Sequence, residues 1–124
     1  MAEKILIVDD SVSMRQMTSL ILKNAGYEVE AASDGEEGLS KVTDEIALII
    51  TDYNMPGVNG IEFIQQVRAG TVNKAVPIIM LTTESEETKK AEGKAAGATA
   101  WLTKPFDKDQ LVATIRKVLG SVTF

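Results

Sequence analysis

Short apolar runs alternate along the chain with longer segments in which apolar residues recur every three or four positions. Continuous apolar runs of this length are typical of strands buried in a parallel sheet that helices cover on both faces. The second run is less apolar than the others and is expected nearer a sheet edge. The predicted strands are, in chain order, Ile5 to Val8, Tyr27 to Ala31, Ala47 to Ile50, Ile78 to Leu81 and Ala100 to Leu102.

The segments between the runs predict amphipathic helices. In the first of them Met14, Met17 and Ile21 recur at helical spacing and are expected to face the core, after a cap at Ser11 or Ser13. The fourth segment is poor in large apolar residues, so this helix is expected to be weakly anchored and the most mobile. The predicted helices contain Met14 to Ile21, Glu36 to Val42, Ile61 to Val67, Ser85 to Ala96 and Leu111 to Leu119.

Strand and helix alternate five times in this pattern. Such alternation predicts right-handed crossovers and a doubly wound α/β domain with a five-stranded parallel sheet. A chain of 124 residues has the size of one domain, and we expect a single domain over residues 1–124. Only four residues follow Gly120, so no output domain is expected after it.

The composition excludes several kinds of chemistry. The chain has no cysteine and no histidine, which rules out disulfides, thiol nucleophiles and a phosphohistidine. The net charge of −5 argues against a surface for nucleic acid or anionic membranes. The N-terminal apolar run is too short for a signal peptide and no stretch could span a bilayer, so a cytoplasmic location is expected.

Polar side chains follow four of the predicted strands at the point where each strand ends. Because the carboxyl ends of parallel strands lie at one edge of a sheet, these side chains are expected to converge there. Each residue alone has an ordinary explanation as a cap, a strand-end hydroxyl or a solvated lysine. Their arrival at one edge favours a functional site that contains Asp9, Asp10, Asp52, Thr82 and Lys104.

Three carboxylates at one site repel one another unless a cation enters. Oxygen ligands without histidine or cysteine favour a hard divalent ion, and beside a phosphate that ion is usually Mg²⁺. A carboxylate such as Asp52 can also act as a nucleophile toward phosphorus and form an aspartyl phosphate. The Lys104 ammonium and the Thr82 hydroxyl could neutralise charge on the phosphoryl oxygens.

The ordered motifs resemble the receiver domains of bacterial two-component response regulators, and the match covers essentially the whole chain. The length of the chain is similar to that of the single-domain, CheY-like regulators of chemotaxis. The resemblance implies a flavodoxin-like (βα)5 fold with strand order 2-1-3-4-5. The residues that carry it are Asp9-Asp10, Asp52, Thr82 and Lys104-Pro105.

The resemblance also implies roles for the acidic residues. Asp52 would be the phosphoacceptor and would ligate Mg²⁺ together with the Asp10 side chain and the Asn54 backbone carbonyl, while Asp9 would help through water. Asn54 and Glu84 match the positions that flank the attacking water in the family, so they are expected to tune hydrolysis of the phosphoryl group.

The family further implies that Lys104 binds a phosphoryl oxygen and precedes Pro105 in a cis peptide bond. Thr82 would move toward the phosphate, and Trp101 would be the aromatic residue that switches with it. The family usually has Tyr or Phe at this second position, and tryptophan is bulkier.

By resemblance the protein is a signalling switch that catalyses only its own phosphorylation and dephosphorylation. A chemotaxis-type histidine kinase would phosphorylate the monomer, and a downstream protein such as the flagellar motor switch would bind the face of the fourth helix, fifth strand and fifth helix. Regulators of the motor commonly carry lysines where this chain has Glu86 and Glu87, although Lys89 and Lys90 follow. A phosphate sink or a relay carrier also fits the pattern.

Two other classes of protein are less compatible with the residues. A magnesium-dependent phosphatase of the haloacid dehalogenase type expects a second aspartate where this chain has Asn54. A flavodoxin-like cofactor binder needs a phosphate loop after the first strand, where Asp9 and Asp10 would repel the phosphate.

Overall fold

The computed structural model describes residues 3–55, 57–83 and 87–120. It confirms the predicted fold, because five parallel strands form one sheet in the order β2-β1-β3-β4-β5. The strands are β1 (Lys4–Val8), β2 (Glu28–Ala32), β3 (Ile46–Asp52), β4 (Ile78–Thr82) and β5 (Ala100–Thr103). The helices are α1 (Val12–Asn24), α2 (Gly35–Lys41), α3 (Gly60–Ala69), α4 (Glu87–Ala96) and α5 (Lys108–Gly120). Among the described residues, no helix is long and apolar enough to cross a bilayer.

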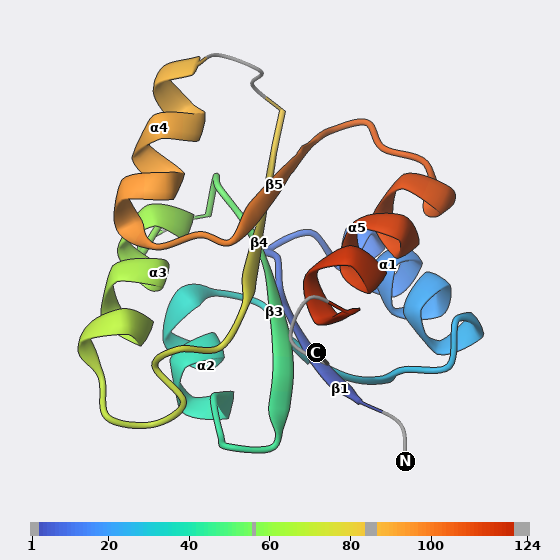
Figure 1. Ribbon diagram of the computed structural model, residues 1–124, viewed down its shortest axis with the longest axis horizontal. Helices are drawn as coiled ribbons and strands as arrows, with labels where there is room; N and C mark the ends of the chain where they lie inside the picture. The colour runs from blue at the N-terminus through green and yellow to red at the C-terminus, as the bar shows by residue number, and fades with distance from the viewer. Residues whose placement is uncertain (1–2, 56, 84–86, 121–124) are drawn as a thin grey trace.

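Helices cover both faces of the sheet, with α2, α3 and α4 on one side and α1 and α5 on the other (Figure 1). Successive side chains of β1 point to opposite faces: Ile5 and Ile7 join the core beneath α1 and α5, whereas Leu6 and Val8 join the core beneath the other helices. The central strands β3 and β4 are buried on both faces, which accounts for their continuous apolar sequences. Strand β2 lies at an edge, as its lower apolar content predicted.

Within the described part of the chain, side chains cap four of the helices, and the cap of α5 is Asp107, which accepts from the Gln110 N–H at 2.7 Å. Ser11 caps α1 by accepting a hydrogen bond from the Met14 N–H, which decides between the two candidate caps. Asp34 caps α2, and Asn59 caps α3 in a reciprocal capping box with Glu62. These caps mark where the loops before α1, α2 and α3 end.

The expectation that Met14, Met17 and Ile21 all face the core is wrong for Met17, which is 44% exposed. The buried residues of α1 are Thr18 and Leu22, while Met14 and Ile21 are half-buried. Apolar residues occur around most of the circumference of α1, so helical spacing alone does not select a buried face. The docking of α1 against the sheet and α5 selects it.

The C-terminal half of α4 lies close to the sheet. A Cβ at Gly93 would come within 2.7 Å of the Met80 Cε atom, so a larger residue there would require the end of the Met80 side chain to move. Arg68 of α3 donates from Nε and Nη2 to the Gly97 carbonyl oxygen at 3.1 and 2.7 Å. These contacts hold one end of α4, and the expected mobility of this helix stays a prediction.

Substitution of Gly60, the first residue of α3, tests the close approach of this helix to the end of β3. A Cβ there would clash with the Asp52 carbonyl oxygen, so Gly60→Ala should destabilise the protein by about 2–4 kcal/mol. Urea unfolding measures the loss. Gly120→Ala is the control, because beyond the backbone of its own helix no described atom lies within 4 Å of a Cβ at Gly120. Equal stability of the two variants would contradict the close approach of α3 to β3.

Candidate functional site

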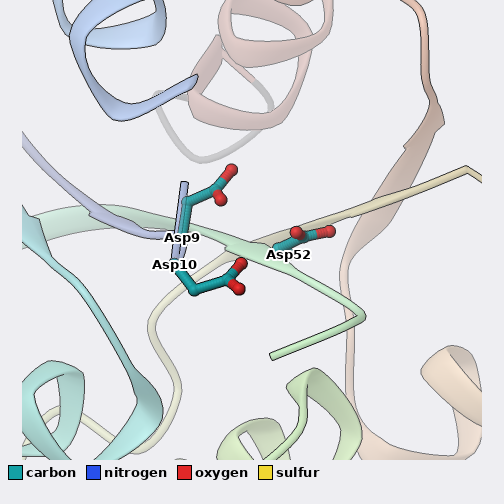
Figure 2. Close-up of side chains that lie close together, drawn as sticks. All are labelled: Asp9, Asp10 and Asp52. Carbon is teal, nitrogen blue, oxygen red and sulfur yellow. The ribbon is translucent and has the colours of Figure 1, made fainter. Parts of the chain in front are cut away.

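Asp9, Asp10 and Asp52 lie together at the carboxyl edge of the sheet, where Asp10 is exposed and the other two are buried. One carboxylate oxygen of each residue lies within 4.8 Å of the others (Figure 2). The Lys104 Nζ atom completes the cluster at 3.2 Å from Asp52 Oδ2 and 3.7 Å from Asp9 Oδ2. The convergence predicted from strand ends is therefore present for the three carboxylates and the lysine.

Asp9 is held by contacts from two sides. Its side chain is almost fully buried, and Oδ1 accepts a hydrogen bond from the Ser11 N–H at 2.9 Å. Its own N–H donates to the Ala32 carbonyl oxygen at 3.1 Å, which continues the pairing of β1 with β2. Buried carboxylates need such partners, and these hydrogen bonds supply them to Asp9.

Asp52 ends β3 and is 8% exposed. The loop that follows is tied to the sheet, because the Tyr53 N–H donates to the Leu81 carbonyl oxygen at 2.8 Å and the Gly60 N–H donates to the Tyr53 carbonyl oxygen at 2.9 Å. Burial raises the pKa of the Asp52 carboxyl above its ordinary value, the Lys104 ammonium opposes this rise, and the Asp9 carboxylate adds to it. The ionised form of Asp52 is therefore disfavoured even with Lys104 beside it, and a further positive charge would favour ionisation.

Lys104 owes its position to the pairing of β4 with β5. Its backbone N–H donates to the Thr82 carbonyl oxygen at 2.7 Å, so its side chain starts directly beside the end of β4. The peptide bond between Lys104 and Pro105 is cis. The lysine side chain is 14% exposed, and its ammonium lies between the carboxylates of Asp9 and Asp52.

The donor set fits Mg²⁺. Three carboxylates supply hard oxygen ligands at one point, and the sequence offers neither histidine nor cysteine to favour a softer metal. Asp10 and Asn54 line the same cavity of about 450 Å³ outside the acidic cluster. The residues present can therefore hold a small, strongly hydrated divalent ion between the three carboxylates.

The two residues expected to switch lie on neighbouring strands. Thr82 is fully buried at the end of β4, and Trp101 pairs with Met80, two residues earlier on the same strand. The Trp101 ring is half-exposed and lies beneath the Lys90 ammonium, at 6.0 Å from ring centroid to Nζ. A cation at this distance stabilises an exposed ring weakly, by about 0.5–1 kcal/mol.

Several expected residues lie outside the described part of the chain. Glu84, expected to tune hydrolysis, is among them, and so is Glu86. The side chain of Glu87 is likewise not described, although its backbone begins α4.

Sequence reasoning missed two contacts that reach the site from outside it. The Tyr53 hydroxyl donates to Glu92 Oε2 at 3.3 Å and links the residue after Asp52 to α4. The Arg15 guanidinium donates to the Asp9 carbonyl oxygen at 2.6 Å. No spacing rule pairs Tyr53 with a residue 39 positions away, and an arginine in the first turns of a helix is ordinary in sequence.

The comparisons with known proteins agree with this geometry. The model of the family described as "Response regulator receiver domain" matches residues 5–116. The chain belongs to this family. Receiver domains are signalling switches of two-component systems that interact with sensor histidine kinases and effectors, and they bind Mg²⁺ at an acidic pocket. They are not enzymes in the usual sense.

Two curated relatives that resemble this chain are described as transcriptional regulatory proteins. The phosphate regulon transcriptional regulatory protein PhoB of Escherichia coli is 32% identical over 99% of the chain and 54% of PhoB. The uncharacterized transcriptional regulatory protein YrkP of Bacillus subtilis is 40% identical over 93% of the chain and 48% of YrkP. The chain thus spans about half the length of the curated relatives that it matches.

Two solved structures match nearly end to end. The chemotaxis response regulator CheY4 of Vibrio cholerae is 50% identical, with a TM-score of 0.90 over 95% of this chain and 99% of that chain. A response regulator from Chloroflexus aurantiacus is 36% identical, with a TM-score of 0.91 over 97% of this chain and 99% of that chain. Both the receiver fold and its strand order are shared with these structures.

The raised pKa of Asp52 predicts a pH-dependent stability. Without metal, folding favours the protonated carboxyl, so wild-type stability should fall as the pH rises from the ordinary value of 3.8 through the higher folded pKa. Asp52→Asn removes this effect while Lys104 keeps Asp9 as its partner, and should be more stable at pH 7 by about 1–2 kcal/mol. Urea unfolding in EDTA from pH 4 to 7 measures the difference.

Mg²⁺ should make the wild type more stable than Asp52→Asn, because it stabilises only a protein that keeps the Asp52 carboxylate. Asp44→Asn, at an exposed aspartate, is the control and should behave as wild type throughout. If Asp52→Asn proves less stable than wild type in EDTA at pH 7, burial does not dominate at this carboxyl.

Proposed function

We propose that Asp52 accepts a phosphoryl group from the phosphohistidine of a sensor kinase. The observation that carries the proposal is the Asp52 carboxylate itself, 3.2 Å from the Lys104 ammonium and within 4.8 Å of Asp9 and Asp10 oxygens. A carboxylate oxygen attacks phosphorus, the P–N bond breaks, and the leaving histidine nitrogen keeps the electron pair. Transfer of this kind requires mainly alignment and positive charge around the phosphoryl oxygens.

The positions of the carboxylates support separate roles in holding Mg²⁺. Asp10 is exposed beside Asn54, which fits direct ligation by the Asp10 side chain, Asp52 and the Asn54 backbone carbonyl. Asp9 already accepts from Ser11 and lies near Lys104, so it would act through a water molecule. When bound, Mg²⁺ supplies the charge that keeps Asp52 ionised and neutralises the transferring group.

Lys104 is proposed to move from Asp52 Oδ2 to an oxygen of the new phosphoryl group. The ammonium is held between two carboxylates, so this exchange replaces one anionic partner with another at little reorganisation. Asn54 is proposed to flank the water that later hydrolyses the aspartyl phosphate, and it is exposed at the mouth of the site. Glu84 is proposed for the same step by resemblance alone.

Output is proposed to run through Thr82 and Trp101 to the face formed by α4, β5 and α5. A phosphoryl group on Asp52 offers the Thr82 hydroxyl a charge-assisted hydrogen bond. Movement of Thr82 would free space that the half-exposed Trp101 ring could enter. A change of a few kcal/mol is enough to invert the two populations.

We infer a role in chemotaxis, because the solved relative at 50% identity is described as a chemotaxis response regulator. Within this proposal the chain is a cytoplasmic, monomeric receiver over residues 1–124, and the flagellar motor switch is one candidate effector. The relatives described as transcriptional regulatory proteins favour a second candidate, in which the receiver controls a further domain. A phosphate sink or a relay carrier is a third. Affinity capture on the beryllofluoride-activated protein, compared with the untreated protein, separates them by the partner retained.

Phosphorylation at Asp52 is tested with acetyl phosphate and MgCl₂. The wild type should gain one phosphoryl group, Asp52→Asn none, and Asp10→Ala much less because the metal is held poorly. Intact mass spectrometry measures the product, and Asp44→Asn serves as the control. Labelling of Asp52→Asn at the wild-type level would overturn the assignment.

Trp101, the only tryptophan in the chain, should report activation. Beryllofluoride with MgCl₂ should reduce quenching of its fluorescence by iodide, on the order of twofold, because the ring becomes buried. Acrylamide must give the same result, since the nearby Lys90 ammonium attracts iodide. Thr82→Ala should blunt the change, while Thr71→Ala, at an exposed threonine, should not. Unchanged quenching in the wild type would show that Trp101 does not switch.

A further inference from the structure

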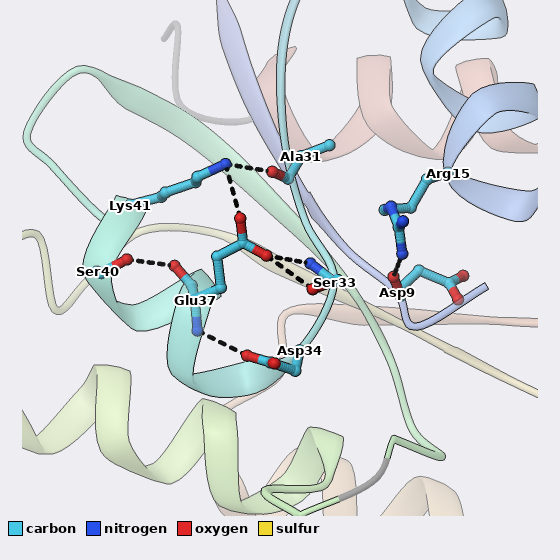
Figure 3. A network of polar contacts seen from close by, with 8 residues as sticks. All are labelled: Asp9, Arg15, Ala31, Ser33, Asp34, Glu37, Ser40 and Lys41. Atoms are coloured by element: carbon cyan, nitrogen blue, oxygen red, sulfur yellow. Dashed lines mark hydrogen bonds and ion pairs between the residues drawn. The ribbon is translucent and has the colours of Figure 1, made fainter. Parts of the chain in front are cut away.

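The side chain of Arg15 reaches the acidic loop from α1. Its Nη1 atom donates to the carbonyl oxygen of Asp9 at 2.6 Å (Figure 3). The arginine is well placed for this contact, because its own N–H donates to the Ser11 carbonyl oxygen at 3.0 Å and Ser11 caps the helix. The guanidinium therefore reaches back across the turn that joins β1 to α1.

With this bond, four separate groups of Asp9 are engaged. Its N–H donates to Ala32, Oδ1 accepts from Ser11, Oδ2 lies near Lys104, and its carbonyl oxygen accepts from Arg15. The Asp9 carbonyl oxygen and the Asp10 nitrogen belong to one planar peptide group. Arg15 thus sets the orientation of the peptide plane from which Asp10 begins.

We propose that Arg15 is a positioning residue for the divalent-cation site. It holds the Asp9–Asp10 peptide so that the exposed Asp10 carboxylate is directed toward Asp52, where one oxygen of each lies within 4.8 Å. Outer groups that orient metal ligands commonly change metal affinity by roughly 10–100-fold when they are removed. The inference rests on the Mg²⁺ site proposed above.

Charge alone predicts the opposite effect. A guanidinium near three carboxylates repels an incoming cation, so removing it would strengthen Mg²⁺ binding if Arg15 acted only through its field. A merely structural role would lower stability and leave affinity unchanged. Positioning predicts weaker Mg²⁺ binding despite the loss of a positive charge. Tighter, unchanged and weaker binding therefore distinguish charge repulsion, a structural role and positioning.

Lys41 offers a matched control. Its Nζ atom donates to the Ala31 carbonyl oxygen at 2.6 Å, so it is also a cationic side chain bound to a strand carbonyl, but on β2 (Figure 3). Its removal deletes the same charge and a bond of the same length, together with an ion pair to Glu37 at 3.2 Å, and leaves the Asp9–Asp10 peptide untouched.

Isothermal titration calorimetry with MgCl₂, repeated with MnCl₂, tests the proposal on the full chain. Arg15→Met should weaken binding about tenfold, Arg15→Lys should recover part of the affinity, and Lys41→Met should bind as wild type. Labelling by acetyl phosphate adds a second readout. The rate for Arg15→Met should be low at limiting MgCl₂ and return toward the wild-type rate at saturating MgCl₂.

Unchanged or tighter binding by Arg15→Met would overturn the proposal while leaving the phosphoacceptor assignment intact. Binding by wild type no stronger than by Asp10→Asn would remove the Mg²⁺ site itself and with it both proposals. Thermal unfolding without metal shows which variants fold. If Arg15→Met does not fold, Arg15→Ala decides, because an unchanged or tighter affinity overturns positioning and a weaker one supports it.

Discussion

The site depends on carboxylates that burial and mutual repulsion make costly, gathered where one lysine can offset them. Asp9 and Asp52 are both buried, and the Lys104 ammonium lies within 3.7 Å of an oxygen of each. Paired charges of this kind are tolerated only when each has partners, and removal of the cation would leave two uncompensated acids. Lys104 thus offsets the cost of the buried carboxylates only in part, and the cluster gains further when positive charge enters beside Asp10.

Hydrogen bonds fix the loops that carry these carboxylates. The Tyr53 backbone is bonded to both β4 and α3, and the Asp9 residue is bonded through its backbone and its side chain. A loosely held loop would let the carboxylates separate and relieve their repulsion. Holding like charges together lowers the stability of the fold, and functional sites in proteins commonly carry such a cost.

The same edge of the sheet is connected to α4 by side chains. Tyr53 bonds to Glu92, Lys90 lies over Trp101, and Gly93 lies against Met80. All three contacts involve residues of α4, and Arg68 donates to the Gly97 carbonyl oxygen just after the end of this helix. A displacement at the end of β3 or β4 can therefore move α4 directly, and α4 forms part of the surface that we propose for output.

Sequence alone was sufficient for the fold class and for the convergence of four polar residues at one edge of the sheet. Continuous apolar runs, alternating with helical segments, determined a parallel sheet, and the topology of such a sheet puts Asp9, Asp10, Asp52 and Lys104 at one edge. The sheet and its polar edge follow from backbone geometry and from hydrophobic burial, so the order and spacing of the residues predict both. The strand order itself came from resemblance and was confirmed by the structure.

Only the tertiary structure decided which face of α1 is buried and which side chains support the site. Apolar residues surround most of α1, so its docking against the sheet, rather than its periodicity, exposed Met17 and buried Thr18. The bonds from Arg15 to Asp9 and from Tyr53 to Glu92 use ordinary residues at spacings that carry no signal. Such contacts depend on how elements distant in sequence are placed in space, and local patterns do not record that placement.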